Sequence, residues 1–236
     1  VYLTDYVMAP YTANLAYHTL TPFWFPAWAL LEPLVGTVHA MNAIFALALT
    51  LNGVVFFAFP RAERVPPGLA LVGGVLVMLA PVMFTAVYWT NINLLNWFWL
   101  PGVVLVWRRI VQTRSLGWAL TLGLMLWAML LCDLQYAIFG LFLVVPYGLW
   151  TLWHAAGRGR LLLLGAGAVT VALALLWVAG PLPYLDDLNR AGQSPTPPER
   201  AYAVEFPQAW VWNLGPNGRM VSLGVVILPL ALVAGV

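Results

Sequence analysis

Long apolar stretches separated by short polar connections dominate the chain. Most of them are about 17 to 25 residues long, the length that an α-helix needs to cross a hydrocarbon core of about 30 Å. A shorter apolar stretch at 22–36 contains three prolines, which indicates an interfacial or re-entrant helix. The pattern predicts an all-α, polytopic transmembrane helical bundle of about seven spans plus this short helix. The expected spans are 37–59, 69–90, 93–107, 117–132, 135–153, 161–185 and a last one that begins near residue 220.

Asp133 interrupts one of the longest apolar runs, which extends from Ser115 to Trp153. As a single helix this run would measure roughly 58 Å at 1.5 Å per residue, which exceeds the thickness of a bilayer. We therefore expect two spans joined by a tight turn near Asp133 and Gln135. The turn places the carboxylate at a membrane surface.

All ten basic residues are arginines, and most of them lie in alternate connections between the spans. Under the positive-inside rule these connections are cytoplasmic. The turn at Asp133, the amino-terminal loop at 1–21 and the loop at 186–219 are then extracytoplasmic, together with the short helix that completes residues 1–36. The arginines in question are Arg61 and Arg64 after the first span, Arg108, Arg109 and Arg114 after the third, and Arg158 and Arg160 after the fifth.

Composition agrees with this topology, because 63% of the residues are hydrophobic and 8% are charged, whereas soluble domains carry about a quarter charged residues. We expect a multi-pass protein of a cell membrane, built as a single transmembrane domain over residues 1–236 and surrounded by membrane lipids. The net charge of +2 does not favour nucleic acid as a partner. The chain begins at Val1, and its last apolar segment is short for a span, so we expect a fragment of a longer protein.

The segment WTNINLLNWFWLPG, at 89–102, combines asparagines with tryptophans at an expected outer boundary. One interpretation is an aromatic belt with amides that cap helices. The other is a polar cavity, lined by Asn91, Asn93 and Asn96, that binds a hydroxylated headgroup. The sequence leaves both open.

Seven of the eight acidic residues fall on the expected outer face. Asp5 and Asp133 belong to different outer connections and could converge on one site as general bases. Asp133 is either a turn-forming residue or a wall of that site. His18 and His39 match no metal-ligand spacing, so we predict no cofactor, and a divalent metal stays open.

Four segments in order carry a resemblance to a known family: TDYVMAPYTANLAYHTLTP, HAMNAIFALALTLNG, NINLLNWFWLPGVVLVWRR and CDLQY. Over residues 1–160 the chain resembles integral-membrane glycosyltransferases of the GT-C type. The resemblance implies an active site on the extracytoplasmic face, a polyprenyl-phosphate-linked sugar as donor, and an acidic general base in the first outer loop.

By position, this resemblance places Asp5, Asn14 and His18 in the first outer loop, and Asp133 and Gln135 on a later outer turn. We expect Asp5 and Asp133 to be catalytic. The expected substrate-binding residues are Asn14, His18, Asn91, Asn93 and Gln135, with Arg190, Arg200 and Arg219 as candidates for the donor phosphate. Alternative functions are a transporter or flippase for a lipid-linked glycan, which would carry ionisable residues in mid-span, and a non-catalytic membrane scaffold.

Overall fold

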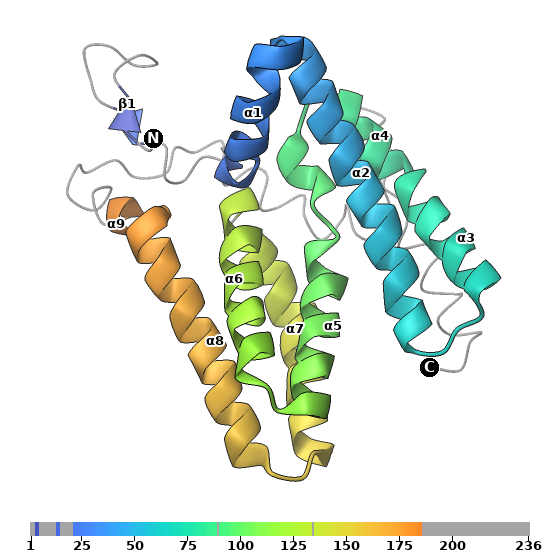
Figure 1. Cartoon of the computed structure of the whole chain (residues 1–236), viewed down its shortest axis with the longest axis vertical. Helices are drawn as coiled ribbons and strands as arrows, with labels where there is room; N and C mark the ends of the chain where they lie inside the picture. Colours follow the sequence, from blue (N-terminus) through green and yellow to red (C-terminus); the bar gives the residue numbers. More distant parts are fainter. Residues whose placement is uncertain (1–2, 5–12, 15–20, 89, 134, 186–236) are drawn as a thin grey trace, which may run out of the picture.

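The described part of the chain is a bundle of α-helices (Figure 1), so the predicted helical fold is confirmed. A computed structural model of the protein describes residues 3–4, 13–14, 21–88, 90–133 and 135–185. The described residues also include two antiparallel strands of two residues each, β1 (Leu3–Thr4) and β2 (Ala13–Asn14). The predicted loop at 186–219 and the predicted span near residue 220 lie outside the described residues.

The first helices form a hairpin. A 3-10 turn, η1 (Pro22–Trp24), leads into α1 (Phe25–Val35), and α2 (Thr37–Ala62) runs back along it. Gly36 joins the two helices with a φ of 80°, a conformation that glycine adopts without the steric cost of a Cβ. The predicted short helix therefore exists and packs against the first span.

The second predicted span, 69–90, is not one continuous helix. It consists of α3 (Pro67–Met78) and α4 (Pro81–Tyr88), with a break at Leu79 and Ala80. The break follows from Pro81, which has no N–H to continue the helical hydrogen bonds.

The third predicted span, 93–107, is displaced toward the carboxyl terminus. The asparagine-rich segment forms only a 3-10 turn, η2 (Ile92–Leu95), and the helix α5 (Trp99–Thr113) begins four residues after it. Asparagine side chains compete with the helix for backbone hydrogen bonds, which explains the late start. At the other end α5 continues through Arg108 and Arg109.

The second half of the chain follows the prediction more closely. α6 (Leu116–Cys132) and α7 (Gln135–His154) form the expected hairpin around Asp133. α8 (Arg158–Ala179) follows, and the predicted sixth span is interrupted before its end, because Gly180 and Pro181 separate α8 from the short α9 (Leu182–Leu185).

Among the described residues, four segments are long and apolar enough to cross a membrane: Thr37–Ala62, Pro67–Tyr88, Gln135–His154 and Arg158–Ala179. They correspond to the first, second, fifth and sixth predicted spans. α6 is a shorter apolar helix.

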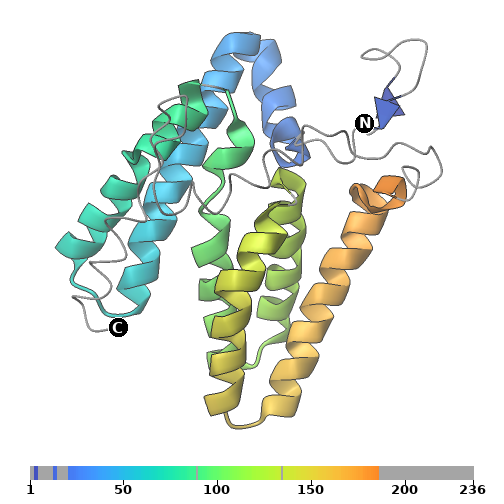
Figure 2. The same ribbon diagram turned by 180° about the vertical axis from the view of Figure 1, so that it is seen from behind.

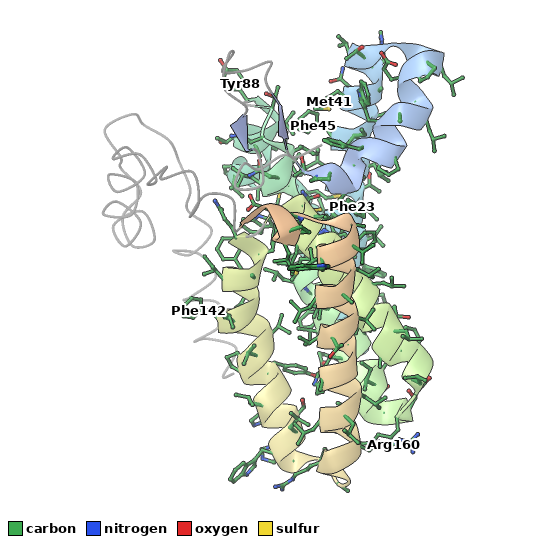
Figure 3. All side chains as sticks on the ribbon, turned by 90° about the vertical axis from the view of Figure 1, so that its left-hand side faces the viewer. Phe23, Met41, Phe45, Tyr88, Phe142 and Arg160 are labelled. Atoms are coloured by element: carbon green, nitrogen blue, oxygen red, sulfur yellow. The ribbon has the colours of Figure 1, made fainter. Side chains whose placement is uncertain are left out.

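The closest helix packing occurs where glycines face a neighbouring helix. α2 packs on α3, where a Cβ at Gly74 would lie 2.5 Å from the carbonyl oxygen of Gly53. α6 packs on α8, where a Cβ at Gly123 would lie 2.8 Å from the carbonyl oxygen of Ala168. Small residues that let backbones approach are typical of helix pairs in membranes. By contrast α7 lies on the outside of the bundle (Figure 2), and Phe142 points away from it (Figure 3).

The two ends of the bundle differ in their polar residues. At one end, which we call the arginine end, lie the α2–α3, α5–α6 and α7–α8 connections. Arg108 on α5 forms an ion pair with Glu63, and the Nη2 of Arg114 donates to the carbonyl oxygen of Ala156 at 2.5 Å. The three arginine-bearing connections therefore share one end of the described helices. At the other end, which we call the amide end, η1 and η2 meet the α6–α7 connection.

Candidate functional site at the amide end

Asn96 is the centre of the amide end. Its residue is 0% exposed, and its side-chain Nδ2 donates to the carbonyl oxygens of Ile92 at 2.8 Å and Asn93 at 3.2 Å. Its Oδ1 accepts a hydrogen bond from the indole N–H of Trp24 at 3.0 Å. A buried amide with its groups satisfied in this way fixes the path of the backbone around it.

Tyr136 connects this segment to α7. Its hydroxyl donates to the carbonyl oxygen of Asn93 at 2.8 Å and accepts from the backbone N–H of Asn96 at 3.1 Å. The two backbone groups lie at the end of η2, and α5 begins only at Trp99. One phenolic oxygen therefore replaces the hydrogen bonds that a regular helix would have made.

Asp133 lies three residues before Tyr136 and is 5% exposed. Its Oδ1 accepts from the backbone N–H of Gln135 at 2.8 Å, and its Oδ2 accepts from the side-chain amide of Asn93 at 2.9 Å. The first bond is the local turn typical of aspartate before a helix. The first bond is the one that the turn-forming interpretation expects, and the second bond adds a contact with a distant segment.

The carboxylate keeps capacity for a further donor. An ionised carboxyl group offers about four lone-pair positions, and the described residues fill two of them. Within residues 21–88, 90–133 and 135–185, its partners are an amide and a backbone N–H, and the one ion pair there joins Arg108 to Glu63. A carboxylate held by two neutral donors can still accept a hydrogen bond from a hydroxyl group.

Aromatic side chains close the site on the side of η1. The ring of Phe23 contacts the rings of Trp24 and Trp99 in edge-to-face geometry, with centroids 4.9 and 5.1 Å apart. The indole N–H of Trp99 points to the sulfur of Cys132 at 3.1 Å. These contacts attach η1 to α5, and α5 to the last residue of α6, which directly precedes Asp133.

Asn52 connects α2 to the η2 turn at the amide end. It is 0% exposed, and its Nδ2 donates to the carbonyl oxygen of Leu95 at 2.6 Å. Its Oδ1 has no hydrogen-bond partner among the described residues.

The predicted site residues are brought together only in part. Asn93 and Asp133 contact each other directly, and Gln135 takes part through its backbone N–H. Asn91 is exposed, and its side chain makes no capping hydrogen bond to η2. The backbone of Asn14 is placed in β2. The predicted residues Asp5, His18, Arg190, Arg200 and Arg219 lie outside the described residues.

Two residues of the site, Tyr136 and Trp24, were not predicted from the sequence. Tyr136 could have been found, because it lies at the start of the helix that follows the predicted turn at Asp133, next to the predicted residue Gln135. Trp24 could not, because its partner is 72 residues away in the sequence.

No group of three histidine, cysteine, aspartate or glutamate side chains in the described part of the chain is placed to hold a metal ion. Among the described residues, the polar side chains of the amide end are one carboxylate, amides and a phenol.

The described helices are those of an integral membrane protein, since four described segments have the length and composition of membrane spans. Comparisons with protein-family models, with curated proteins and with solved structures found no match to this chain.

Proposed function

We propose that the protein is an integral-membrane glycosyltransferase of the GT-C type, which moves a sugar from a polyprenyl-phosphate carrier to an acceptor hydroxyl. The observation that supports it most is the state of Asp133. Its carboxylate is ionisable, held in place by Asn93 and Gln135, and still able to accept a hydrogen bond. A general base needs these three properties.

In the proposed reaction Asp133 takes the proton of the acceptor hydroxyl. The acceptor oxygen forms a bond to the anomeric carbon while the bond between that carbon and the phosphate oxygen breaks, and the polyprenyl phosphate leaves. Asn93 adjoins the carboxylate and supplies amide groups for sugar hydroxyls. Arg190, Arg200 and Arg219 are the proposed contacts of the phosphate, because guanidinium groups match phosphate geometry.

The amino-terminal segment completes the proposed site. Residues 1–20 reach the bundle at Thr21, next to Phe23 and Trp24. We assign Asp5 to catalysis as a second base, and Asn14 and His18 to substrate binding. The arginine end is proposed to face the cytoplasm under the positive-inside rule, which puts the amide end on the extracytoplasmic face.

A transporter for a lipid-linked glycan fits the described helices less well. Transport pathways place ionisable residues in the middle of membrane helices. α3, α4 and α7 contain no aspartate, glutamate, lysine or arginine, and α8 carries its two arginines at its first residues.

The test uses the full-length protein, reconstituted in liposomes with a panel of radiolabelled polyprenyl-phosphate hexoses and pentoses. We expect Asp133→Asn to lower transfer by about 100-fold or more, the range of general-base catalysis. Glu63→Gln, which removes a carboxylate at the arginine end, is the matched control and should keep full activity. Folded yield is measured for both variants by size-exclusion chromatography.

Transfer by Asp133→Asn and Asp5→Asn at the rate of the original protein would remove both residues from the mechanism. If no donor of the panel is consumed and a labelled glycolipid instead crosses the liposome membrane, the transferase proposal is replaced by the transporter.

A further inference from the structure

The arginine end concentrates positive charge that is scattered in the sequence. Seven arginines from three connections lie there with one glutamate, which leaves a net charge of +6 in the described residues. Figure 3 shows Arg160 at this end, far from Phe23 and Tyr88. The end is therefore a surface for anions.

Three of these arginines gather around the α7–α8 connection. Arg114 donates from Nη2 to the carbonyl oxygen of Ala156 at 2.5 Å, and Arg160 donates from Nη2 to the carbonyl oxygen of Arg114 at 2.9 Å. Arg158 donates from Nη2 to the carbonyl oxygen of Trp153 at 2.6 Å. Each guanidinium group is thus positioned by a neutral carbonyl, and its charge has no carboxylate partner among the described residues.

Donors remain available in this cluster. The Nη1 of Arg114 is buried and has no hydrogen-bond partner among the described residues. Arg158 and Arg160 are exposed, and each uses one terminal nitrogen for its carbonyl. A guanidinium group has five N–H donors, so the exposed Arg158 and Arg160 keep donors for an incoming oxyanion.

Two helices begin beside the cluster, and both favour an anion. α6 starts after Ser115 and α8 after Gly157, neither cap residue forms a side-chain hydrogen bond, and neither helix has an acidic residue in its first turn. The free N–H groups and the positive end of each helix dipole add to the charge of the arginines.

The surroundings are those of a membrane surface. Trp153 is 71% exposed, and the guanidinium of Arg158 lies 5.7 Å from the centre of its ring. Leu149, Trp150 and Leu163 are exposed nearby on α7 and α8. Tryptophan next to arginine at the end of an apolar helix is typical of the level of lipid headgroups, with acyl chains along the helix.

We propose that Arg114, Arg158 and Arg160 bind the phosphate of an anionic phospholipid headgroup, whose acyl chains lie against α7 and α8. Charge, free donors, two helix starts and an adjoining apolar surface all fit this ligand. Free phosphate would use the same donors but would have no contact with Trp153. The site lies at the opposite end from Asp133, so it does not rest on the proposed glycosyl transfer.

The test compares two pairs of arginines that carry equal charge. The full-length protein is purified in detergent, mixed with phosphatidylglycerol or phosphatidylcholine, and the retained lipid is counted by native mass spectrometry. Arg158→Gln with Arg160→Gln removes two guanidinium groups of the cluster. Arg61→Gln with Arg64→Gln removes two from the α2–α3 connection and is the matched control.

We expect the original protein to retain phosphatidylglycerol in preference to phosphatidylcholine. The cluster variant should lose affinity by about tenfold or more, since each arginine near a membrane surface contributes a factor of about five. The control should change by less than about threefold. Trp153→Ala should weaken the binding of phosphatidylglycerol. It should not change the effect of inorganic phosphate on the melting temperature.

Equal losses in the two double variants would overturn the proposal in favour of general charge attraction, and so would equal retention of the two lipids. Inorganic phosphate that stabilises the protein as much as phosphatidylglycerol does would identify a free anion as the ligand and overturn the lipid assignment. If the glutamine variant does not fold, Arg158→Lys with Arg160→Lys keeps the charge and removes the paired donors. Unchanged phosphatidylglycerol retention in that variant would overturn the proposed guanidinium contacts.

Discussion

The amide end and the arginine end satisfy their polar groups in opposite ways. At the amide end, Asn96, Tyr136 and Asp133 are buried and bond to one another's segments, so donors and acceptors both come from the protein. At the arginine end, guanidinium groups donate to backbone carbonyls and stay largely exposed. The free energy of the first arrangement depends on every protein partner, whereas the exposed guanidinium groups of the second can also form hydrogen bonds to molecules outside the protein.

This difference predicts that substitutions at the amide end lower the free energy of unfolding more than substitutions at the arginine end. An unpaired polar group inside an apolar bundle costs about 1–3 kcal/mol, but an exposed ion pair contributes about 0–1 kcal/mol. The same number of hydrogen bonds is therefore expected to stabilise the amide end far more than the arginine end. Four substitutions test this expectation through the free energy of unfolding in detergent micelles, measured by titration with sodium dodecyl sulfate.

Asn96→Ala should have the largest effect. It leaves the buried indole N–H of Trp24 without its acceptor and removes both side-chain hydrogen bonds to η2, so we expect a loss of about 3–4 kcal/mol. Asn91→Ala, five residues earlier and exposed, is the control and should change the free energy of unfolding by less than about 0.5 kcal/mol. Equal effects at the two positions would contradict the role of Asn96.

Gly123→Ala should be second, and it probes the helices between the two ends. The new Cβ would approach the carbonyl oxygen of Ala168 to 2.8 Å, so α6 and α8 must separate. We expect a loss of about 1–3 kcal/mol from overpacking. Gly167→Ala adds the same methyl group to α8 where no atom lies within 4 Å, and it should be neutral or slightly stabilising. A neutral Gly123→Ala would show that the two helices pack less closely.

Tyr136→Phe should follow, because it removes one oxygen atom and keeps the ring. The backbone N–H of Asn96 and the carbonyl oxygen of Asn93 lose their common partner, and we expect a loss of about 1–2 kcal/mol. Tyr147→Phe is the control on the same helix, since its hydroxyl has no hydrogen-bond partner among the described residues. A larger effect at Tyr147 than at Tyr136 would reverse the comparison between the ends.

Glu63→Gln should have the smallest effect. The ion pair with Arg108 is partly exposed, with the Glu63 side chain 50% accessible, so its loss should cost about 0.5 kcal/mol or less. Raising the salt concentration should reduce the difference in the free energy of unfolding between the variant and the original protein, because salt screens exposed charges. A loss above about 2 kcal/mol would show that the arginine end is held together by buried charge.

The sequence predicted the helices well where one property decided the outcome. The length of the run from Ser115 to Trp153 excluded a single span, and the structure has the turn at Asp133. The alternation of arginines predicted which connections share an end, and the bond from Arg114 to Ala156 agrees. Both arguments use a constraint that acts on every residue of a membrane helix.

The prediction was weaker where side chains compete with the helix. Hydropathy extended the second span through Pro81 and began the third at Asn93, because it counts apolar residues and ignores missing or diverted hydrogen bonds. The contact between Asn93 and Asp133 spans 40 residues, and that between Trp24 and Asn96 spans 72. Such pairs depend on how helices cross, which the order of residues alone does not specify.

The packing of α6 on α8 has a consequence for how the protein is made. The two helices run in the same direction, and α7 lies between them in the sequence but contacts each of them far less. Because synthesis proceeds from the amino terminus, α6 leaves the ribosome before its main partner exists. The surface of α6 around Gly123 therefore faces lipid or the insertion machinery until α8 has been synthesised. The packing of this half of the bundle is completed only after that step.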